Sequence, residues 1–206
     1  MTVLVCSWKS FYQRDLSVYL TSQDPGEAWF GEAVVDRVCS CICRLDGVTK
    51  ETSILDVGCG NAHLLISLVK ALDLQDAWGS DYIDEALVIA EKYAKDVHYI
   101  HSLKFVCDDI LATTIDRSFD LVVDKGTFDA IALSGKEEDK VAYRNSINAL
   151  CTKYFVVTSC NFVKDELVAF FSGTTWQVKQ QIPYPVFSFG GATGSTVTSL
   201  VFERVV

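Results

Sequence analysis

The chain has 206 residues, half of them hydrophobic, and a net charge of -9. This composition excludes a disordered chain and allows one domain with a sizeable core. The acidic charge disfavours a nucleic-acid partner, because it repels phosphate backbones, and would attract a basic protein or a cationic small molecule. On charge alone, the favoured alternative is that the acidity only keeps the protein soluble.

The N-terminal apolar run is short, because MTVLV is followed at once by Cys6 and Ser7. It is too brief for a signal-peptide core or a membrane span. We therefore expect a soluble protein of the cytoplasm, with the nucleus as an alternative, and no membrane contact. The eight scattered cysteines fit a reducing compartment.

Residues 8–22 and 31–46 carry apolar residues at helical spacing and flank the turn-like SQDPGEAWFG. We interpret residues 1–50 as an N-terminal helical extension or lid. The second segment holds Cys39, Cys41 and Cys43. No histidine nearby completes a zinc set, and alternate residues of a helix project on different sides, so we predict packing residues and no metal site.

From residue 51 the chain alternates strand-like and helix-like periods with short connections. This pattern predicts a mostly parallel sheet with helices on both faces. We find no repeat or low-complexity linker, so residues 51–206 are predicted to form one domain. Strands are expected at about 53–57, 77–81, 103–107, 119–124 and 154–159, and helices at about 61–72, 84–95, 137–151 and 164–171.

The C-terminal segments WQVKQQI and TVTSLVFERV are typical of a closing pair of strands. Between them, IPYPVFSFGGATGS (residues 182–195) contains two prolines and three glycines, which predicts a loop that caps the core or covers a site. The expected fold is an α/β, Rossmann-like sheet of seven strands, mostly parallel, whose last strand is antiparallel.

The strongest motif is ILDVGCGNAHLL, residues 54–65. Gly58 and Gly60 let the backbone turn sharply and approach a ligand closely. A dinucleotide-binding loop would have a third glycine where this chain has His63. Asp56 would repel a pyrophosphate but can hold an ammonium group. The motif therefore favours a ligand with an amino group, and the alternative is a glycine turn with a solvated acid.

Within this motif, DVGCGN resembles motif I of the Rossmann-like methyltransferases. In those enzymes the backbone around the glycines meets the methionine part of S-adenosylmethionine. The resemblance implies that the cofactor contacts Asp56, Gly58, Cys59, Gly60 and Asn61.

Acids end the next two strands as well. Asp81 follows Gly60 by 21 residues, the distance at which an acid on the neighbouring strand accepts bonds from ribose hydroxyls. Asp108 stands where such an enzyme binds the adenine amino group. Asp109 is a further cofactor candidate or only a solvated acid, and Tyr82 is expected to stack beside the adenosine. Acids at three successive strand ends predict a ligand in the crevice at that edge.

The fourth strand ends in VVDKGTFDAI, residues 122–131. Amino-methyltransferases that act on bases or glutamine carry N-P-P-Y here, which holds a planar nitrogen. The D-K-G-T of this chain argues against such substrates and suits a group that arrives as a cation. Asp124 is our first candidate for binding the amine, ahead of Asp129. Asp124 is also a candidate for contact with the cofactor. Lys125 is expected to pair with an acid or to aid packing and not to react, and its role stays open.

The resemblance then becomes specific. DKGTFDAI, together with TSCNF (158–162), PYPVFSFGG (183–191) and GEAWFGE (26–32), resembles the elongation factor 1-alpha lysine methyltransferases, the methyltransferase-like protein 10 group. The likeness runs from about Trp8 to the C-terminus. It implies N-methylation of a lysine on that translation factor with S-adenosylmethionine. The chain departs from the family at Ala62, where a glycine is usual.

Such an enzyme must hold a lysine ammonium, whose pKa is about 10.4, let it lose a proton and present the neutral amine. Asp124 would orient the amine, and either a side chain or water would take the proton. Phe128, with Trp29, Phe30 and Phe162, is expected to form aromatic walls or to pack in the core. Trp29 is also a candidate for cofactor contact.

Asn161 is expected to bond the substrate backbone or to cap the next helix. Two other functions stay open: methylation of a small amine or thiol on the same fold, and a scaffold that binds the cofactor without turnover. The expected partner is a basic protein, namely elongation factor 1-alpha, and the expected state is a monomer.

Overall fold

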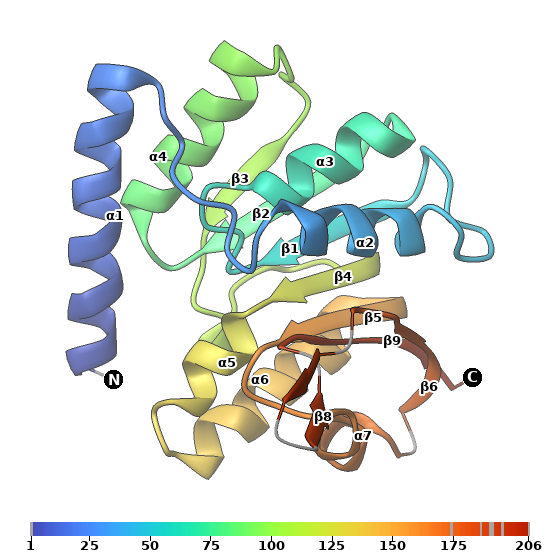
Figure 1. Cartoon of the computed structure of the whole chain (residues 1–206). Coiled ribbons are helices and arrows are strands. Elements are labelled where there is room, and N and C mark those ends of the chain that lie inside the picture. Colours follow the sequence, from blue (N-terminus) through green and yellow to red (C-terminus); the bar gives the residue numbers. More distant parts are fainter. Residues whose placement is uncertain (1, 174, 186, 190–191, 195, 206) are drawn as a thin grey trace.

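The computed structural model describes the backbone of residues 2–173, 175–185, 187–189, 192–194 and 196–205, and the side chains of residues 8–173, 175–185 and 196–205. Its main feature is a seven-stranded sheet in the order β3-β2-β1-β4-β5-β9-β6 (Figure 1). The strands are β1 Ser53–Val57, β2 Asp76–Asp81, β3 Lys104–Cys107, β4 Phe119–Lys125, β5 Cys151–Ser159, β6 Trp176–Ile182 and β9 Thr198–Arg204.

Strands β1 to β5 pair in parallel, and β9 lies antiparallel between β5 and β6. The predicted fold class is therefore confirmed, including the antiparallel last strand. Successive strands run outward from β1 on one side and from β4 on the other. In open α/β sheets this reversal of strand order opens a crevice at the carboxyl ends of the strands, where ligands bind.

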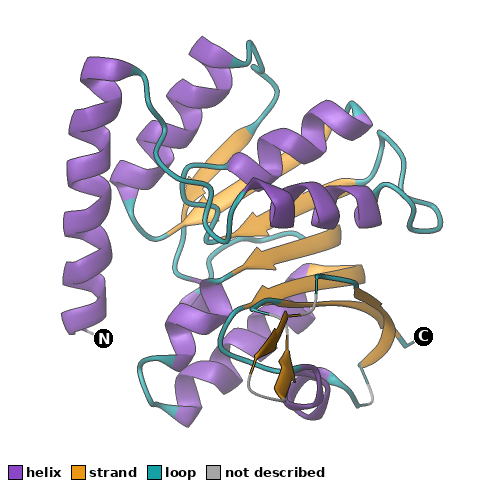
Figure 2. Ribbon diagram, viewed as in Figure 1, coloured by secondary structure: helices purple, strands orange, loops and turns teal. Residues whose placement is uncertain are grey.

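Helices cover both faces of the sheet (Figure 2). One core cluster joins α2 and α3 to the sheet, and another joins α5, α6 and α7 to the opposite face. A third, smaller cluster joins α1 to α4. The helices are α1 Thr2–Ser22, α2 Glu32–Ile42, α3 His63–Leu72, α4 Asp84–Lys92, α5 Thr127–Ala132, α6 Glu137–Leu150 and α7 Lys164–Phe171, with a π-helical turn at Tyr93–Val97 and a 3-10 turn at Ile110–Ala112.

The alternation of strand residues decides which face each side chain meets. Leu121 and Val123 of β4 pack under α2 and α3, whereas Val122 between them packs under the α5–α7 layer. Successive side chains of a strand point to opposite faces. Asp124 and Lys125, the last two residues of β4, therefore face opposite layers.

The N-terminal helix α1 stands beside the carboxyl edge of the sheet, along α4 (Figure 1). Tyr12 and Tyr19 of α1 pack on Ile83, Ala86 and Ile89. Because α1 packs on α4 and α2 packs in the first core cluster, both N-terminal helices are joined to the rest of the described chain. Their action as a lid stays a prediction.

Several predicted elements differ from the observed ones. Helix α1 begins at Thr2 and not at residue 8, and β5 begins at Cys151, where helix was expected. Helix α5 was not predicted, because six residues are too few to display a helical apolar period. It begins after Gly126, whose φ of 91° is left-handed.

The expected loop at 182–195 is partly wrong, because β7 Phe187–Phe189 and β8 Ala192–Gly194 pair as an antiparallel hairpin. Glycines between two short apolar runs are a hairpin signal that the prolines masked. Residues 186, 190, 191 and 195 of the predicted loop lie outside the described residues.

Cys39 and Cys41 pack in the core, as predicted, whereas Cys43 is exposed. Over the part of the chain that the structure describes, no three His, Cys, Asp or Glu side chains are arranged to hold a metal ion. A helix long and apolar enough to cross a membrane is likewise absent from the described residues.

Candidate active site

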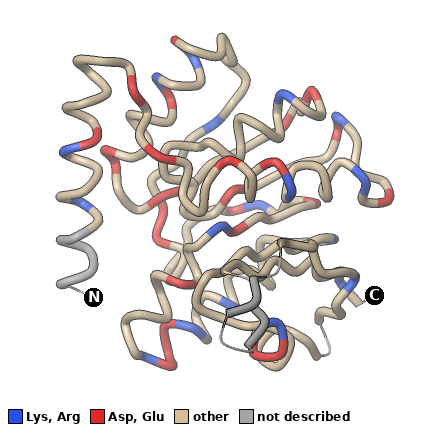
Figure 3. Tube along the Cα trace, in the orientation of Figure 1, with Lys and Arg blue, Asp and Glu red and all other residues tan. Residues whose placement is uncertain are grey.

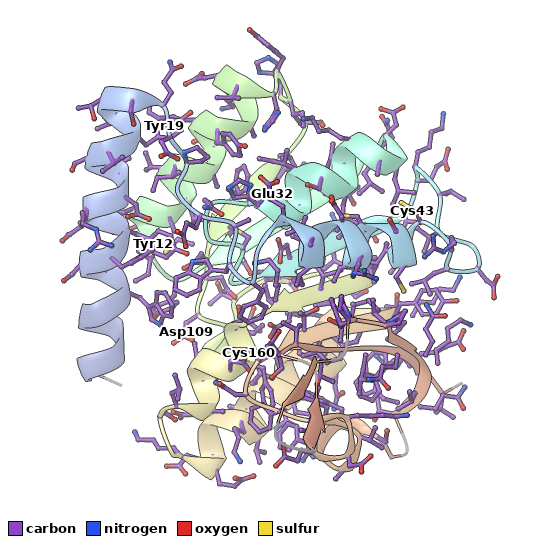
Figure 4. The ribbon with its side chains drawn as sticks, in the orientation of Figure 1. Tyr12, Tyr19, Glu32, Cys43, Asp109 and Cys160 are labelled. Carbon is purple, nitrogen blue, oxygen red and sulfur yellow. The ribbon has the colours of Figure 1, made fainter. Side chains whose placement is uncertain are left out.

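A cavity of about 300 Å³ lies at the carboxyl edge of the sheet, where the first four strands end. Acidic segments gather at this edge (Figure 3). Figure 4 shows Tyr12 of α1, Asp109 after β3 and Cys160 after β5 around the same region. The lining residues are Trp8, Tyr12, Trp29, Phe30, Gly58, Ser80, Asp81, Tyr82, Ile83, Asp108, Ile110, Lys125, Gly126, Thr127, Asp129, Ala130, Leu133, Cys160 and Asn161.

The glycine loop after β1 is held tightly between α5 and α1. Gly58 has φ +63°, and a Cβ there would lie 2.0 Å from Oγ1 of Thr127. Gly60 has φ +55°, and a Cβ there would lie 2.5 Å from the hydroxyl oxygen of Tyr12. Both conformations and both spaces exclude any side chain. The loop therefore presents bare backbone to the cavity.

Asp81 fixes this loop from the end of β2. Its carboxylate accepts hydrogen bonds from the Gly60 amide at 3.1 Å and from the Ile83 amide at 3.0 Å. Burial raises the pKa of Asp81 to about 6, and these backbone bonds oppose the rise. Asp81 also lines the cavity. It can accept a bond from a ligand hydroxyl there.

Asp108 has an acceptor atom with no partner. Its Oδ1 accepts bonds from the Thr114 amide at 2.7 Å and the Thr114 hydroxyl at 3.1 Å. Its buried Oδ2 has no hydrogen-bond partner among the described residues. An unsatisfied buried carboxylate oxygen costs free energy unless a ligand donates to it. Because Asp108 lines the cavity, this oxygen fits an N–H donor such as an adenine amino group.

Trp29 and Tyr82 both line the cavity and are 39% exposed. Trp29 packs edge-on against Trp8, with ring centroids 5.2 Å apart. Rings held in this way can stack on a planar ligand. Contact of either ring with the cofactor stays a prediction.

Five of the predicted cofactor contacts have side chains outside the cavity wall, namely Asp56, Cys59, Asn61, Asp109 and Asp124. Asn61 donates to the carbonyls of Pro25 at 2.9 Å and Glu27 at 3.1 Å, and so fastens the connector between α1 and α2 to the glycine loop. The Cys59 side chain is buried. Asp109 accepts a bond from the Leu111 amide at 3.0 Å and begins the 3-10 turn.

Asp56 lies on the face of the sheet under α2 and α3 and is only 3% exposed. Burial raises its pKa to about 7, nearby Lys125 opposes the rise, and Asp124 and Asp81 add to it. Its carboxylate therefore lies in an environment that favours a second cation. The side chain is not part of the cavity wall.

Asp124 faces the other layer. Its carboxylate accepts hydrogen bonds from the Thr127 and Phe128 amides, each at 2.9 Å, and from the Tyr143 hydroxyl. Burial raises its pKa to about 7, and these bonds oppose the rise. Asp124 therefore holds the start of α5, and the structure does not bring it to the cavity. Its amine-binding and cofactor contacts stay predictions.

Lys125 and Asp129 take the places at the cavity wall instead. The Lys125 ammonium lies 5.8 Å from the centre of the Phe30 ring. Asp129 of α5 accepts bonds from the Ser159 hydroxyl at 2.5 Å and the Cys160 amide at 2.8 Å. Each carboxylate oxygen can accept one more bond. The acid that faces the cavity from this segment is therefore Asp129.

Phe128 is 1% exposed and packs in an aromatic cluster, 5.0 Å from Phe162 and 5.2 Å from Tyr143 between ring centroids. Neither Phe128 nor Phe162 lines the cavity, whereas Trp29 and Phe30 do. The predicted aromatic walls are thus divided between the cavity and the core.

Asn161 lines the cavity directly after β5. Its role toward a substrate stays a prediction. Among the wall residues that sequence reasoning missed are Trp8 and Tyr12. Their spacing of four places both on one side of α1, and this helical aromatic pair was the available signal.

Comparison with known proteins identifies the family of the chain. A family model described as a methyltransferase domain matches residues 48–191. EEF1A lysine methyltransferase 2 of Danio rerio is 33% identical over 202 residues, which are 96% of this chain and 85% of the relative. The enzyme of the same name from Homo sapiens is 32% identical over 96% of this chain and 84% of its own length. Protein-lysine N-methyltransferase efm4 of Schizosaccharomyces pombe is 32% identical, with 95% and 91% covered.

Solved structures share the fold. Magnesium protoporphyrin IX methyltransferase from Synechocystis, with bound SAM, has a TM-score of 0.67 at 17% identity and is covered to 84%, against 95% of this chain. N-methyltransferase NodS from Bradyrhizobium japonicum has a TM-score of 0.68 at 11% identity, with 95% of this chain and 97% of that chain covered. The chain belongs to the methyltransferase family, in the group that contains the EEF1A lysine methyltransferases 2 and the protein-lysine N-methyltransferases efm4.

Proposed function

We propose that the protein is an S-adenosylmethionine-dependent protein-lysine N-methyltransferase that acts on elongation factor 1-alpha. The observation that carries this proposal is the identity of about one third, over nearly the whole chain, to relatives named for that activity. It extends beyond residues 48–191, which the methyltransferase-domain model matches. The N-terminal segment, which lines the cavity, is thus part of the likeness.

Asp108 and Asp81 in the cavity wall, and Asp56 behind it, suit three polar parts of the proposed cofactor, whose sulfonium supplies the methyl group. The unpartnered Oδ2 of Asp108 suits an adenine amino group. Asp81 suits the ribose hydroxyls. Asp56, in its charged form, suits the amino group of the methionine moiety, because opposite charge stabilises a buried carboxylate.

The substrate amine needs a different part of the wall. Asp129 faces the cavity and can accept a bond from a lysine ammonium. The faces of Trp29 and Phe30 attract a cation on the same wall. Asp124 acts through α5, since it fixes the helix on which Asp129 stands. Asn161 is placed to bond the backbone of the substrate protein.

The remaining parts of the proposal concern the setting of the enzyme. The net charge of -9 favours a basic protein partner over nucleic acid. We propose a monomeric enzyme in the cytoplasm. Size-exclusion chromatography and localisation of a tagged chain would check these two points.

The test is methylation of elongation factor 1-alpha by the purified protein with isotope-labelled S-adenosylmethionine. Mass spectrometry of the digested factor should locate the label on lysine. Asp108→Ala serves as the cofactor-site control and should reduce labelling. Labelling of small metabolites in a lysate, with the translation factor left unmodified, would overturn the proposal.

A further inference from the structure

The Lys125 side chain presents to the cavity a cation that forms no ion pair or hydrogen bond with the described residues. Among the described residues, no carboxylate lies within 4.0 Å of its ammonium, and it makes no hydrogen bond. Its ammonium lies over the ring face of Phe30, 5.8 Å from the ring centre. Burial lowers the pKa of Lys125, which shows that the ammonium is partly removed from water. A cation in this setting fits an anionic ligand group.

The position of Lys125 is fixed relative to Asp56. Strands β1 and β4 are parallel neighbours, with Asp56 opposite Val123. Lys125 follows Val123 by two residues, so it points to the same face as Asp56 and stands one pleat closer to the carboxyl edge. The two charges influence each other's pKa but do not form an ion pair. The two side chains are therefore neighbours on one face of the sheet, and each charge can bind a different ligand group.

Lys125 is also the one basic residue among the described residues that line the cavity, beside Asp81, Asp108 and Asp129. A ligand carboxylate in this cavity would be repelled by the three acids unless a cation compensates. The proposed cofactor carries both an amino group and a carboxylate on the α-carbon of its methionine moiety. Such a zwitterion needs an acid and a base next to each other.

We propose that Lys125 binds the carboxylate of the methionine moiety of S-adenosylmethionine, while the neighbouring Asp56 binds its amino group. The pair thereby recognises the amino-acid end of the cofactor by charge. This inference rests on the cofactor of the proposed function and not on the protein substrate. It gives a role to the residue that the sequence left unassigned.

Binding of three adenosine ligands separates this role from a general effect on charge or folding. S-Adenosylhomocysteine carries the carboxylate and the amine, S-adenosyl-3-thiopropylamine carries only the amine, and methylthioadenosine carries neither. Calorimetry should show that Lys125→Met lowers the affinity for S-adenosylhomocysteine by about 10- to 100-fold, the range expected for loss of a charge-assisted hydrogen bond. The other two ligands should not be weakened.

Two further variants control the experiment. Lys164→Met removes the same charge from the exposed start of α7 and should leave all three affinities unchanged. Lys125→Arg should retain part of the preference for the carboxylate. The ratio between ligands within one variant does not depend on its folded fraction, so a partly unfolded Lys125→Met protein still gives a result.

The proposal fails if Lys125→Met binds S-adenosylhomocysteine as tightly as the parent protein does, or weakens all three ligands equally. Equal weakening would assign Lys125 to packing or to compensation of the Asp56 charge. No methyl acceptor is present in these measurements. Their outcome is therefore independent of whether elongation factor 1-alpha is the substrate.

Discussion

Replacement of Asp56 by asparagine should make the free protein more stable at alkaline pH. The pKa of this buried carboxyl group rises from an ordinary 3.8 to about 7. A tenfold change in a protonation equilibrium is about 1.4 kcal/mol, so the charged form is disfavoured by about 4 kcal/mol, as an upper bound. Asp56→Asn removes the charge and keeps the shape.

The sign of the pH dependence follows from the raised pKa. The folded protein holds this proton more tightly than the unfolded chain, so the contribution to stability is fully present below pH of about 4 and is lost as pH rises through about 7. The stability gained by Asp56→Asn should therefore be smaller at pH 5 and largest at pH 8. We expect a gain of about 1–4 kcal/mol there.

Urea denaturation at pH 5, 6, 7 and 8, at constant ionic strength, measures this difference. Calorimetry on the same samples should show the opposite effect on function, because Asp56→Asn loses the charge that holds the amino group of S-adenosylhomocysteine. In the parent protein this affinity should rise with pH up to about 7 and then level. The reasoning would be refuted by an Asp56→Asn protein whose stability follows that of the parent at every pH.

Three other substitutions test separate parts of the site. Gly58→Ala should lower the free energy of unfolding by more than about 2 kcal/mol, because its Cβ would lie 2.0 Å from Oγ1 of Thr127 at a φ of +63°. In urea denaturation, the double variant Gly58→Ala/Thr127→Ala should recover part of this loss, and a loss below about 1 kcal/mol in the single variant would contradict the geometry. Asp124→Asn should lose about 2–3 kcal/mol of unfolding free energy, because an amide oxygen accepts hydrogen bonds from the two α5 amides and Tyr143 more weakly than a carboxylate does. Unchanged stability together with a loss of lysine binding would instead support the amine-binding role of Asp124. Asp108→Ala should lower the affinity for S-adenosylhomocysteine about 5- to 30-fold and that for S-inosylhomocysteine much less, because the inosine ring lacks the amino group that suits the free Oδ2. Calorimetry that shows equal losses of affinity for the two ligands would exclude this pairing.

The positions of Asp81 and Asp108 could be predicted because each is set by local order along the chain. A glycine loop after the first strand and an acid at the end of the next two strands necessarily meet at one edge of a parallel sheet. The alternation of strands and helices along the chain followed from hydrophobic periods and short connections in the same way. None of these features depends on knowing how a side chain is turned.

The environment of Asp124 could not be predicted in this way. Its position at the end of β4 was predicted, but the face of the sheet to which its side chain points was not. That face depends on which β4 residues pack in each of the two core clusters. Counting from Leu121 and Val123 puts Lys125, and not Asp124, beside the cavity. Short α5 then engages the Asp124 carboxylate, and a six-residue helix gives almost no periodic signal.

Asn61 illustrates a second limit. Its two hydrogen bonds join the glycine loop to Pro25 and Glu27, which are more than thirty positions earlier in the sequence. A motif read in isolation assigns such a residue to the ligand, because it cannot show a partner from a distant connector. The same holds for Tyr12 over Gly60.

The residues of the cavity wall are widely separated along the chain, from Trp8 to Asn161. During synthesis, the glycine loop and the acids of the first strands emerge long before Cys160 and Asn161. Contacts of such high sequence separation form late, because loop-closure entropy must be offset first. The ability to bind a ligand should therefore be among the last properties that the folding chain acquires, well after its secondary structure is in place.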